Sequence, residues 1–193
     1  MSRKILIIQG HPDPDERHFG HGLANAYGEA AREAGHRVDE IRVASLQFPF
    51  LAGVEDFEQG EPPADIRRAQ QAIEAADHVV FFYPLWLGDM PAMLKAFLEQ
   101  VFRPAFVADD GMGGFGKRRL NGRSARLVVT MGMPALFYRL FYRAHSVHSF
   151  RRNILRFCGF RPVRATLFGL VAGKARRRER ALARMRRLGR AGT

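Results

Sequence analysis

The first segment of the chain that could do chemistry is GHPDPDERHF at residues 10–19, which follows a short aliphatic run. A turn from a strand into a helix can bind phosphate through the free N–H groups and the positive dipole of the helix N-terminus. Three side chains would add cationic donors to this turn: His11, Arg17 and His18. The segment matches neither G-x-G-x-x-G nor G-x-x-x-x-G-K-[ST], so it is not a dinucleotide fingerprint or a nucleotide P-loop. A second interpretation stays open, a Pro-rich turn in which Asp15 or Glu16 caps the helix.

A second segment, YPLWLGDMP at 83–91, is apolar where a loop would normally carry polar turn residues. It holds the only tryptophan of the chain, Trp86, between two leucines. An aromatic and aliphatic loop at the end of a strand suits a flat ligand, with loop N–H groups near the polar edge of that ligand. The alternative is that Trp86 covers the end of the sheet as part of the core.

A third candidate group follows a later aliphatic run. Thr130 and Gly132 can offer a hydroxyl and a close approach of the backbone. Tyr138 and His145 are seven residues apart, so they share one helix face if the chain between them is helical. Such a pair could stabilise negative charge on a reduced ligand and deliver a proton to an acceptor oxygen. Packing is the alternative explanation for a tyrosine and a histidine on one helix face.

The elements that must position these residues alternate between short apolar runs and longer stretches of helical period. The predicted strands are 3–9, 36–43, 78–83, 125–131 and 163–170. The predicted helices are one around 23–31 that stops at Gly35, then 64–76, 90–102, a long helical region over 138–158 and a basic C-terminal helix. Two segments are predicted to be long loops: 45–62 and the Gly- and Asp-rich 108–122.

This alternation predicts an α/β fold with a doubly wound parallel sheet, because each crossover helix must cover the sheet in a right-handed sense. Five strands and this chain length fit the flavodoxin-like strand order 2-1-3-4-5, in one domain over residues 1–193. In such sheets ligands bind beyond the carboxyl ends of the strands, where the strand order reverses. That rule selects the three segments described above.

Composition sets the broad class. The 193 residues are 47% hydrophobic and 26% charged, which is ordinary for a globular protein. The single cysteine, Cys158, excludes an internal disulfide and a cysteine-based metal cluster, and no metal site is predicted. The longest apolar stretch, 79–87, is far shorter than a membrane-spanning helix requires. We therefore expect a soluble, cytoplasmic protein.

The net charge of +12 is concentrated at the end of the chain. Residues 174–193 hold nine of the 31 Lys and Arg residues but only one of the 19 acidic residues. A solvated helix is the simpler interpretation, and contact with an anionic surface or a membrane protein is the alternative. Because the segment lacks interleaved aromatic residues for base stacking, nucleic acid is not an expected partner.

From the first strand to about Arg164 the chain resembles the NAD(P)H:quinone oxidoreductase family. This family includes modulator-of-drug-activity-type reductases and the ancillary subunits of glutathione-gated potassium efflux systems. Four segments carry the resemblance: the GHPDPD loop, FFYPLWLGDMPAMLKAFLEQVF at 81–102, the TMG turn with Tyr138 and His145, and ILRFCGF at 154–160. The second is the most specific, and all four occur in the family's order.

The resemblance implies a non-covalent FMN or FAD bound at the three segments. It assigns the flavin phosphate to the loop that contains His11, Arg17, His18 and Phe19. It places four residues along the flavin ring: Pro84, Leu85, Trp86 and Leu87. It places Thr130 and Gly132 at the pyrimidine edge. One position departs from the family, because Glu16 stands where many relatives have a phosphate-binding serine; its carboxylate would repel phosphate unless Arg17 or His18 offsets it.

The resemblance also implies a reaction and a partner. Tyr138 and His145 match the family's catalytic Tyr/His pair with one inserted residue. NAD(P)H would give hydride to the flavin and leave, and a quinone would then take the same place, a ping-pong scheme in a homodimer whose active sites lie at the subunit interface. The alternative that the family offers is a regulatory ancillary subunit of a potassium efflux system.

Overall fold

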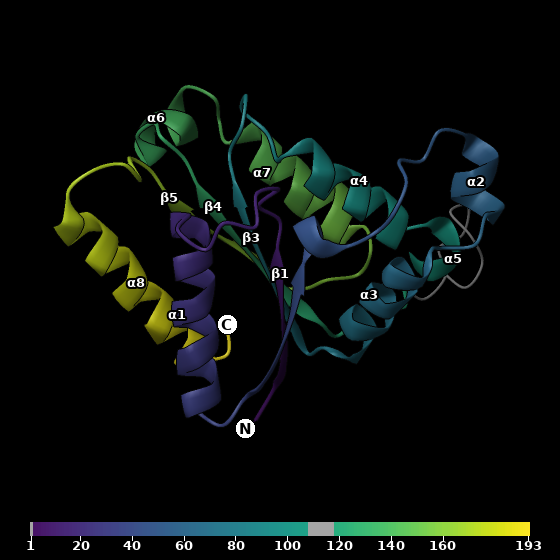
Figure 1. Cartoon of the computed structure of the whole chain (residues 1–193), viewed down its shortest axis with the longest axis horizontal. Helices are drawn as coiled ribbons and strands as arrows, with labels where there is room; N and C mark the ends of the chain where they lie inside the picture. The colour runs from purple at the N-terminus through teal and green to yellow at the C-terminus, as the bar shows by residue number, and fades with distance from the viewer. Residues whose placement is uncertain (1, 108–117) are drawn as a thin grey trace.

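The structure is a computed structural model that describes residues 2–107 and 118–193. Its centre is one sheet of parallel strands in the order β2-β1-β3-β4-β5. The strands are β1 (Lys4–Gln9), β2 (Arg37–Arg42), β3 (His78–Pro84), β4 (Ser124–Thr130) and β5 (Val163–Phe168). The strand order and the parallel direction confirm the predicted flavodoxin-like sheet (Figure 1).

The strands differ in burial as their sequences predict. β3 is buried from His78 to Tyr83, and β1 is buried from Ile5 onward, because helices cover both faces of the inner strands. β2 lies at the edge of the sheet and is half exposed along its length. Its two apolar residues point to opposite faces, because Val38 packs against the cluster with α1 and Ile41 against the cluster on the other side of the sheet.

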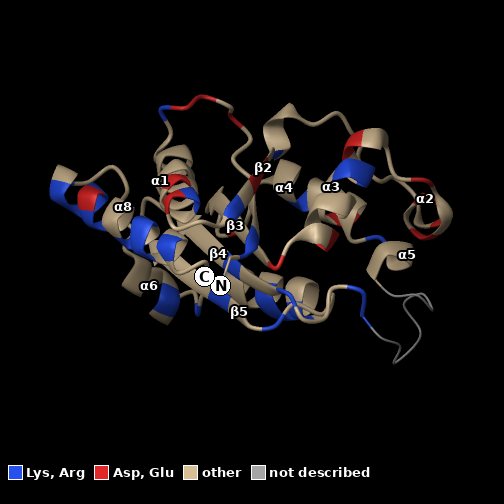
Figure 2. Cartoon of the chain, turned by 90° about the horizontal axis from the view of Figure 1, so that it is seen from below, with Lys and Arg blue, Asp and Glu red and all other residues tan. Residues whose placement is uncertain are grey.

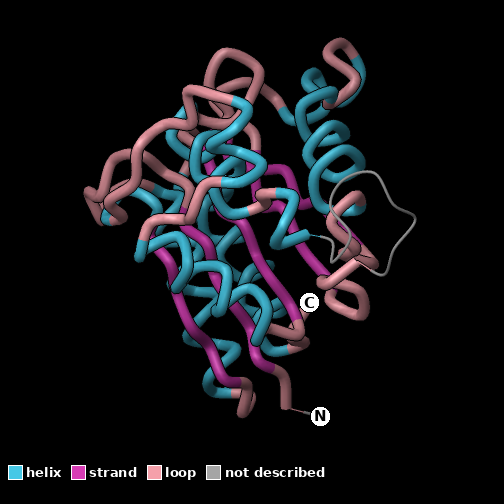
Figure 3. The backbone as a smooth tube through the Cα atoms, turned by 90° about the vertical axis from the view of Figure 1, so that its right-hand side faces the viewer, coloured by secondary structure: helices cyan, strands magenta, loops and turns pink. Residues whose placement is uncertain are grey.

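Helices cover the two faces of the sheet. On one face, α1 (Phe19–Glu33) and α8 (Ala175–Arg190) pack against alternate residues of β1, β3 and β4. On the other face, α3 (Ala64–Ala75), α4 (Ala92–Val101) and α7 (His145–Ser149) enclose a larger cluster of buried residues. Figures 1 and 3 show the strands side by side between these layers, with α1 and α8 together on one side. The resulting three layers leave the carboxyl ends of the strands to the loops.

The basic C-terminal helix is a packed element with one solvated face. In α8, Ala181 and Met185 are buried in the cluster shared with α1, whereas its arginines are exposed. A Cβ at Gly189 would overlap the carbonyl oxygen of Tyr27, so only glycine permits this close approach of the two helices. The packing explains why apolar residues interrupt the arginine-rich sequence.

One predicted loop contains helices. Within 45–62 the chain forms α2 (Val54–Gln59), and a 3₁₀ turn at Val43–Ser45 (η1) precedes it. None of the α2 residues is buried, which explains why the sequence shows no amphipathic period there. A short helix, α5 (Pro104–Val107), follows α4. Most of the Gly- and Asp-rich loop predicted at 108–122 lies outside the described residues.

The long helical region predicted over 138–158 is broken into three pieces, which corrects that expectation. They are α6 (Ala135–Leu140), α7 and a π-helical segment, η2 (Phe150–Arg156). The break falls at Arg143 and Ala144, whose φ angles of 50° and 46° lie in the left-handed region. A right-handed helix cannot pass through such residues. The chain therefore turns between Tyr138 and His145.

Candidate active site

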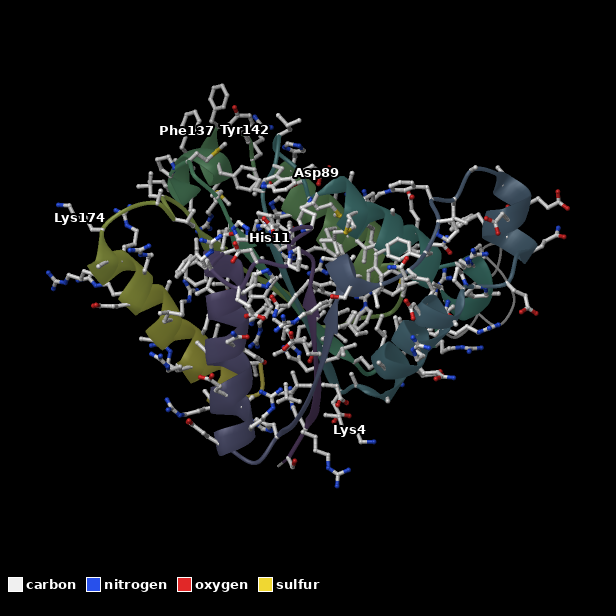
Figure 4. All side chains as sticks on the ribbon, viewed as in Figure 1. Lys4, His11, Asp89, Phe137, Tyr142 and Lys174 are labelled. Carbon is white, nitrogen blue, oxygen red and sulfur yellow. The ribbon has the colours of Figure 1, made fainter. Side chains whose placement is uncertain are left out.

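The three segments selected from the sequence meet at the carboxyl end of the sheet. Hydrogen bonds beyond the strand ends hold their first residues: Gly10 N–H donates to the Phe82 carbonyl at 2.7 Å, and Leu85 N–H donates to the Thr130 carbonyl at 2.8 Å. The loops therefore start from fixed points on adjacent strands. Figure 4 shows His11, Asp89, Phe137 and Tyr142 toward this end of the molecule and Lys4 at the opposite end.

Histidine rings form the centre of the site. The rings of His11 and His18 stack with their centroids 4.1 Å apart. The Trp86 ring meets His11 edge-on at 5.9 Å, which joins the first segment to the second. Burial, and then the neighbouring His18, lower the pKa of His11 below its ordinary value, because both disfavour a charged ring.

The carboxylates of the first loop all have side-chain partners in the structure. Asp13 Oδ2 lies 2.8 Å from His18 Nε2, and Asp15 Oδ2 accepts from Arg17 Nε at 2.9 Å. The Arg17 guanidinium and backbone N–H together lower the pKa of Asp15 to about 2. No side-chain hydrogen bond caps α1, whose N-cap residue is His18. The interpretation that Asp15 or Glu16 caps this helix is therefore wrong.

Glu16 is neutralised by a residue that the sequence did not single out. Its Oε1 accepts a hydrogen bond from Nη1 of Arg42, at the end of β2, and this contact lowers the pKa of Glu16. Arg42 also donates from Nε to Glu40 at 2.7 Å. Neither Arg17 nor His18, which were expected to offset Glu16, contacts it, because each is paired with an aspartate.

Two of the predicted phosphate ligands lie away from the ring cluster. The Arg17 side chain is 90% exposed and is held by Asp15 on the outside of the loop. Phe19 is partly buried and packs against the cluster between the sheet, α1 and α8. In this geometry the side chains that form the ring cluster are histidines.

His21 is a buried member of this loop that sequence reasoning missed. Its Nε2 lies 3.0 Å from the Asp13 carbonyl, and its Nδ1 contacts Oε1 of Gln9. Gln9 directs its amide nitrogen to Glu40 at 2.9 Å, which leaves the amide oxygen facing His21. Two oxygens, from Gln9 and Asp13, therefore face the two ring nitrogens of His21. The available signal was a histidine three residues after His18, on the same face of the first helical turn.

The second segment forms a tight exposed turn. Trp86 and Asp89 exchange two backbone hydrogen bonds of 2.8 and 2.9 Å, and Leu87 and Gly88 at the tip both have positive φ. Leucine at a φ of 47° costs about 1–2 kcal/mol, and such strain concentrates at functional sites. Trp86 is 49% exposed and Leu87 fully exposed. The alternative that Trp86 belongs to the core is therefore wrong.

The donor set and the open space fit a flat ligand that carries phosphate. His11 and His18 lie beside the uncapped N-terminus of α1, where a phosphate would meet free N–H groups. Trp86 offers an exposed aromatic surface next to them. A Cβ at Gly132 would meet no atom within 4 Å, so the backbone after Thr130 faces open space. Leu85 packs against the core and Pro84 is half-buried, so these two residues support the turn.

Tyr138 and His145 do not share a helix face, which corrects the sequence-based prediction. Tyr138 is fully buried in α6, and its hydroxyl lies 2.7 Å from Oγ of Ser146. His145 is exposed at the start of α7, and a Cβ at Gly88 would lie 3.8 Å from its Cε1 atom. His145 therefore lies against the turn that carries Trp86, whereas Tyr138 holds the residue that follows His145. Tyr142 is the partly exposed tyrosine of this segment.

Within residues 2–107 and 118–193, no group of three or more His, Cys, Asp or Glu side chains is arranged to hold a metal ion. In the same ranges, no helix combines the length and the apolar character that crossing a membrane requires.

Comparison with known proteins adds a family and relatives. A family model described as the flavodoxin-like fold matches residues 3–188. An uncharacterized NAD(P)H oxidoreductase from Haemophilus influenzae is 29% identical over 179 residues, covering 89% of this chain and 88% of that protein. The glutathione-regulated potassium-efflux system ancillary protein KefG from Enterobacter sp. is 37% identical over 139 residues, covering 72% of this chain and 64% of that protein. The solved NAD(P)H:quinone oxidoreductase from Methanothermobacter marburgensis is similar with a TM-score of 0.83 and 26% identity, covering 98% of this chain and 96% of that one.

Proposed function

This chain belongs to the flavodoxin-like fold family, and we propose that it is a flavin-dependent NAD(P)H oxidoreductase that reduces a quinone or a similar small acceptor. The net reaction takes NAD(P)H, a proton and a quinone to NAD(P)⁺ and a hydroquinone. The observation that carries the proposal is the junction of His11 with the exposed Trp86 at the point where the strand order reverses. The oxidoreductase names of relatives that match most of this chain support the same reaction class.

The chain's own residues supply the cofactor site. His11 and His18, with the N-terminus of α1, would hold the phosphate of FMN or FAD, and Arg42 would keep Glu16 from repelling it. Trp86 would pack along the ring, and the backbone at Thr130 and Gly132 would meet the pyrimidine edge. A bound flavin supplies the chemistry that accepts hydride from the nicotinamide and passes it to the acceptor.

His145 is the residue that we assign to proton transfer. It is exposed beside the Trp86 turn, which we assign to the flavin ring. Tyr138 acts as a positioning residue, because its hydroxyl holds Ser146 and with it the first turn of α7. A donor held near the acceptor oxygen lowers the barrier because negative charge develops there.

We also propose that the active form is a homodimer. Large apolar side chains are exposed around the mouth of the site: Trp86, Leu87, Leu136, Phe137, Leu140 and Phe141. The stacked rings of Phe137 and Phe141, 5.0 Å apart, project from α6 on the same end of the molecule. An exposed apolar patch of this kind is a protein contact site in most soluble proteins. A second copy would cover it and close the flavin site from above.

A flavin titration tests the proposal. FMN and FAD are added separately while flavin fluorescence is followed. We expect at least one of them to bind saturably with a dissociation constant below about 10 μM, equivalent to about −7 kcal/mol. Anaerobic stopped-flow measurements should then show reduction by NADH or NADPH and reoxidation by a quinone as separate phases. Absence of binding of either flavin at about 100 μM contradicts the proposal.

The match to KefG favours a second candidate function, an ancillary subunit of a potassium efflux system. The exposed arginines of α8 would suit contact with an anionic membrane surface or a membrane protein. Co-sedimentation with membranes that hold an efflux protein, and its loss at high salt, would favour this function. Quinone reduction at enzymatic rates without such a partner would favour the oxidoreductase.

A further inference from the structure

Polar residues occupy an unexpected place at the amino ends of β3, β4 and β5, opposite to the flavin loops. Val80, Phe82 and Val128 face α1 and α8. Because side chains alternate along a strand, His78 and Arg126 lie on the same face as these residues. Arg126 donates from Nη1 to the Thr166 hydroxyl at 2.8 Å. The amino end of this apolar face thus holds a group of buried donors.

Several of these donors lack partners. His78 is 3% exposed, and its Nε2 is buried without a hydrogen bond, while its Nδ1 lies 2.7 Å from the Ser124 hydroxyl. Arg126 is 5% exposed, and its Nε is also unpartnered. The buried hydroxyl of Tyr27 is a third such atom. A buried polar group without a partner costs about 1–3 kcal/mol, so three of them on one face call for an explanation.

The charge around these donors is positive. Burial lowers the pKa of Arg126, and the neighbouring Arg164 and Arg184 lower it further. Burial, then Arg126 and Arg3, lower the pKa of His78 to about 3, so this ring is neutral near pH 7. In the described part of the chain no carboxylate pairs with Arg126. A buried guanidinium without a counter-charge is unfavourable.

An open cavity of about 440 Å³ lies next to this group. Its lining includes three arginines and three other polar residues: Arg3, Arg161, Arg164, His78, Ser124 and Asp77. The one carboxylate among them, Asp77, accepts from the Lys4 backbone N–H at 2.8 Å. Within the described residues, the side chains of Arg161 and Arg164 make no hydrogen bond or ion pair. Figure 2 views this end from below and shows both termini side by side with basic segments around them.

We propose that this cavity is a second binding site, which takes a phosphate group, either free or carried by a small molecule. Guanidinium groups bind phosphate oxygens in bidentate pairs, and three of them converge on the cavity. His78 and Ser124, which contact each other through Nδ1 and the hydroxyl at 2.7 Å, line the same cavity beside these arginines. Arg3 also donates to the Gly192 carbonyl at 3.0 Å, so a ligand there would join the first strand, β5 and the end of α8.

Calorimetric titration of the full chain tests this site independently of the proposed function. The probes are inorganic phosphate, pyrophosphate and AMP at constant ionic strength, with and without saturating FMN. We expect saturable binding of at least one probe, with the same affinity in the presence of FMN, and the tightest probe identifies how the phosphate is carried. Binding that disappears when FMN is added, and that the variant Arg161→Gln/Arg164→Gln leaves unchanged, would place the phosphate at the flavin loops and overturn the proposal.

Matched variants distinguish specific binding at the cavity from nonspecific attraction of an anion by the positive charge of the protein. Arg161 and Arg164 are exposed, so the double variant Arg161→Gln/Arg164→Gln should fold and should bind the probe about 10-fold or more weakly. The control Arg180→Gln/Arg186→Gln removes the same charge from the exposed face of α8 and should bind within about 2-fold of the wild type. The His78 ring signal in NMR should shift with the probe and not with chloride. Equal weakening in both double variants, or no binding to the wild type at about 10 mM, overturns the proposal.

Discussion

The two ends of the sheet differ in whether their charged side chains have partners. At the carboxyl end, each carboxylate of the first loop has a basic side chain as its partner: Asp13 has His18, Asp15 has Arg17 and Glu16 has Arg42. At the amino end, the three cavity-lining arginines and the buried Arg126 outnumber the side-chain carboxylate of Asp77, which accepts from the backbone N–H of Lys4. The charged side chains of the first loop thus have partners without a ligand, whereas several basic side chains at the amino end do not.

This difference shows why the net charge of +12 is a poor guide to function. The arginines of α8 contribute most to it, and they are exposed and solvated. The donors that call for a ligand are fewer, and they are buried or unpaired. Position and partners, more than the number of charges, therefore decide where an anion binds.

The largest expected effect is a difference in the free energy of unfolding between substitutions of two buried arginines, Arg103 and Arg126. Arg103 donates to the backbone carbonyl of Gly60 at 2.7 Å and to Gln100 Oε1 at 2.7 Å, so Arg103→Met should lower the free energy of unfolding by about 3 kcal/mol. Arg126 lacks a counter-charge, so Arg126→Met should leave it unchanged or raise it by up to about 2 kcal/mol. Urea denaturation in phosphate-free buffer measures both. Equal destabilisation would remove the contrast between paired and unpaired cations.

Trp86 tests the carboxyl end. Because its ring is half exposed, Trp86→Ala should weaken flavin binding by about 10-fold or more, equivalent to about 1.4 kcal/mol, while the free energy of unfolding changes by less than about 1 kcal/mol. Trp86→Phe keeps an aromatic face and should restore most of the affinity. Flavin fluorescence and urea denaturation give the two quantities. A loss of stability with unchanged flavin affinity would return this residue to a packing role.

His145 tests proton delivery at the same end. His145→Ala should slow quinone reduction by about 10-fold, or about 1.4 kcal/mol in the barrier, with flavin affinity unchanged. Tyr138→Phe, which removes the bond to Ser146, should slow it less, by about 3-fold. His148→Ala, exposed one turn further along the chain, is the control. Stopped-flow experiments measure the rate of each half-reaction. If His145→Ala and Tyr138→Phe both react at wild-type rates, His145 has no role in the mechanism.

The smallest effect comes from acid titration of the first loop. The pKa of Asp15 is about 2 in the folded chain and higher when unfolded, so its pairing stabilises the fold above about pH 4 and is lost as the pH falls to about 2. Thermal unfolding of the wild type and of Asp15→Asn should therefore differ near pH 6 and converge near pH 2. Because the pair is exposed, high salt should shrink the difference. If the thermal unfolding of the two proteins still differs at pH 2, the effect of the substitution does not come from the Asp15–Arg17 pair.

The sequence by itself determined the fold and the place of the site. Continuous apolar runs such as 78–83 identify inner strands, because period and burial are local properties of the chain. The strand order follows from alternation and handedness, and it brings residues 10–19, 84–89 and 130–134 to one end. Trp86 was recognised because a large aromatic residue in a loop is unusual.

Only the tertiary structure decided which side chains meet. The pairing of Glu16 with Arg42 joins residues on different strands, and His21 gains its role from Gln9 and Asp13. The break at Arg143 and Ala144 could not be predicted, because neither residue type favours positive φ and local period continues through them. The sequence likewise could not predict the unpaired donors at the amino end. They lie on β3, β4 and α1, and only the packing of these three elements decides that each donor is buried without a hydrogen-bond partner. Local chemistry is encoded residue by residue, whereas charge compensation depends on contacts between distant parts of the chain.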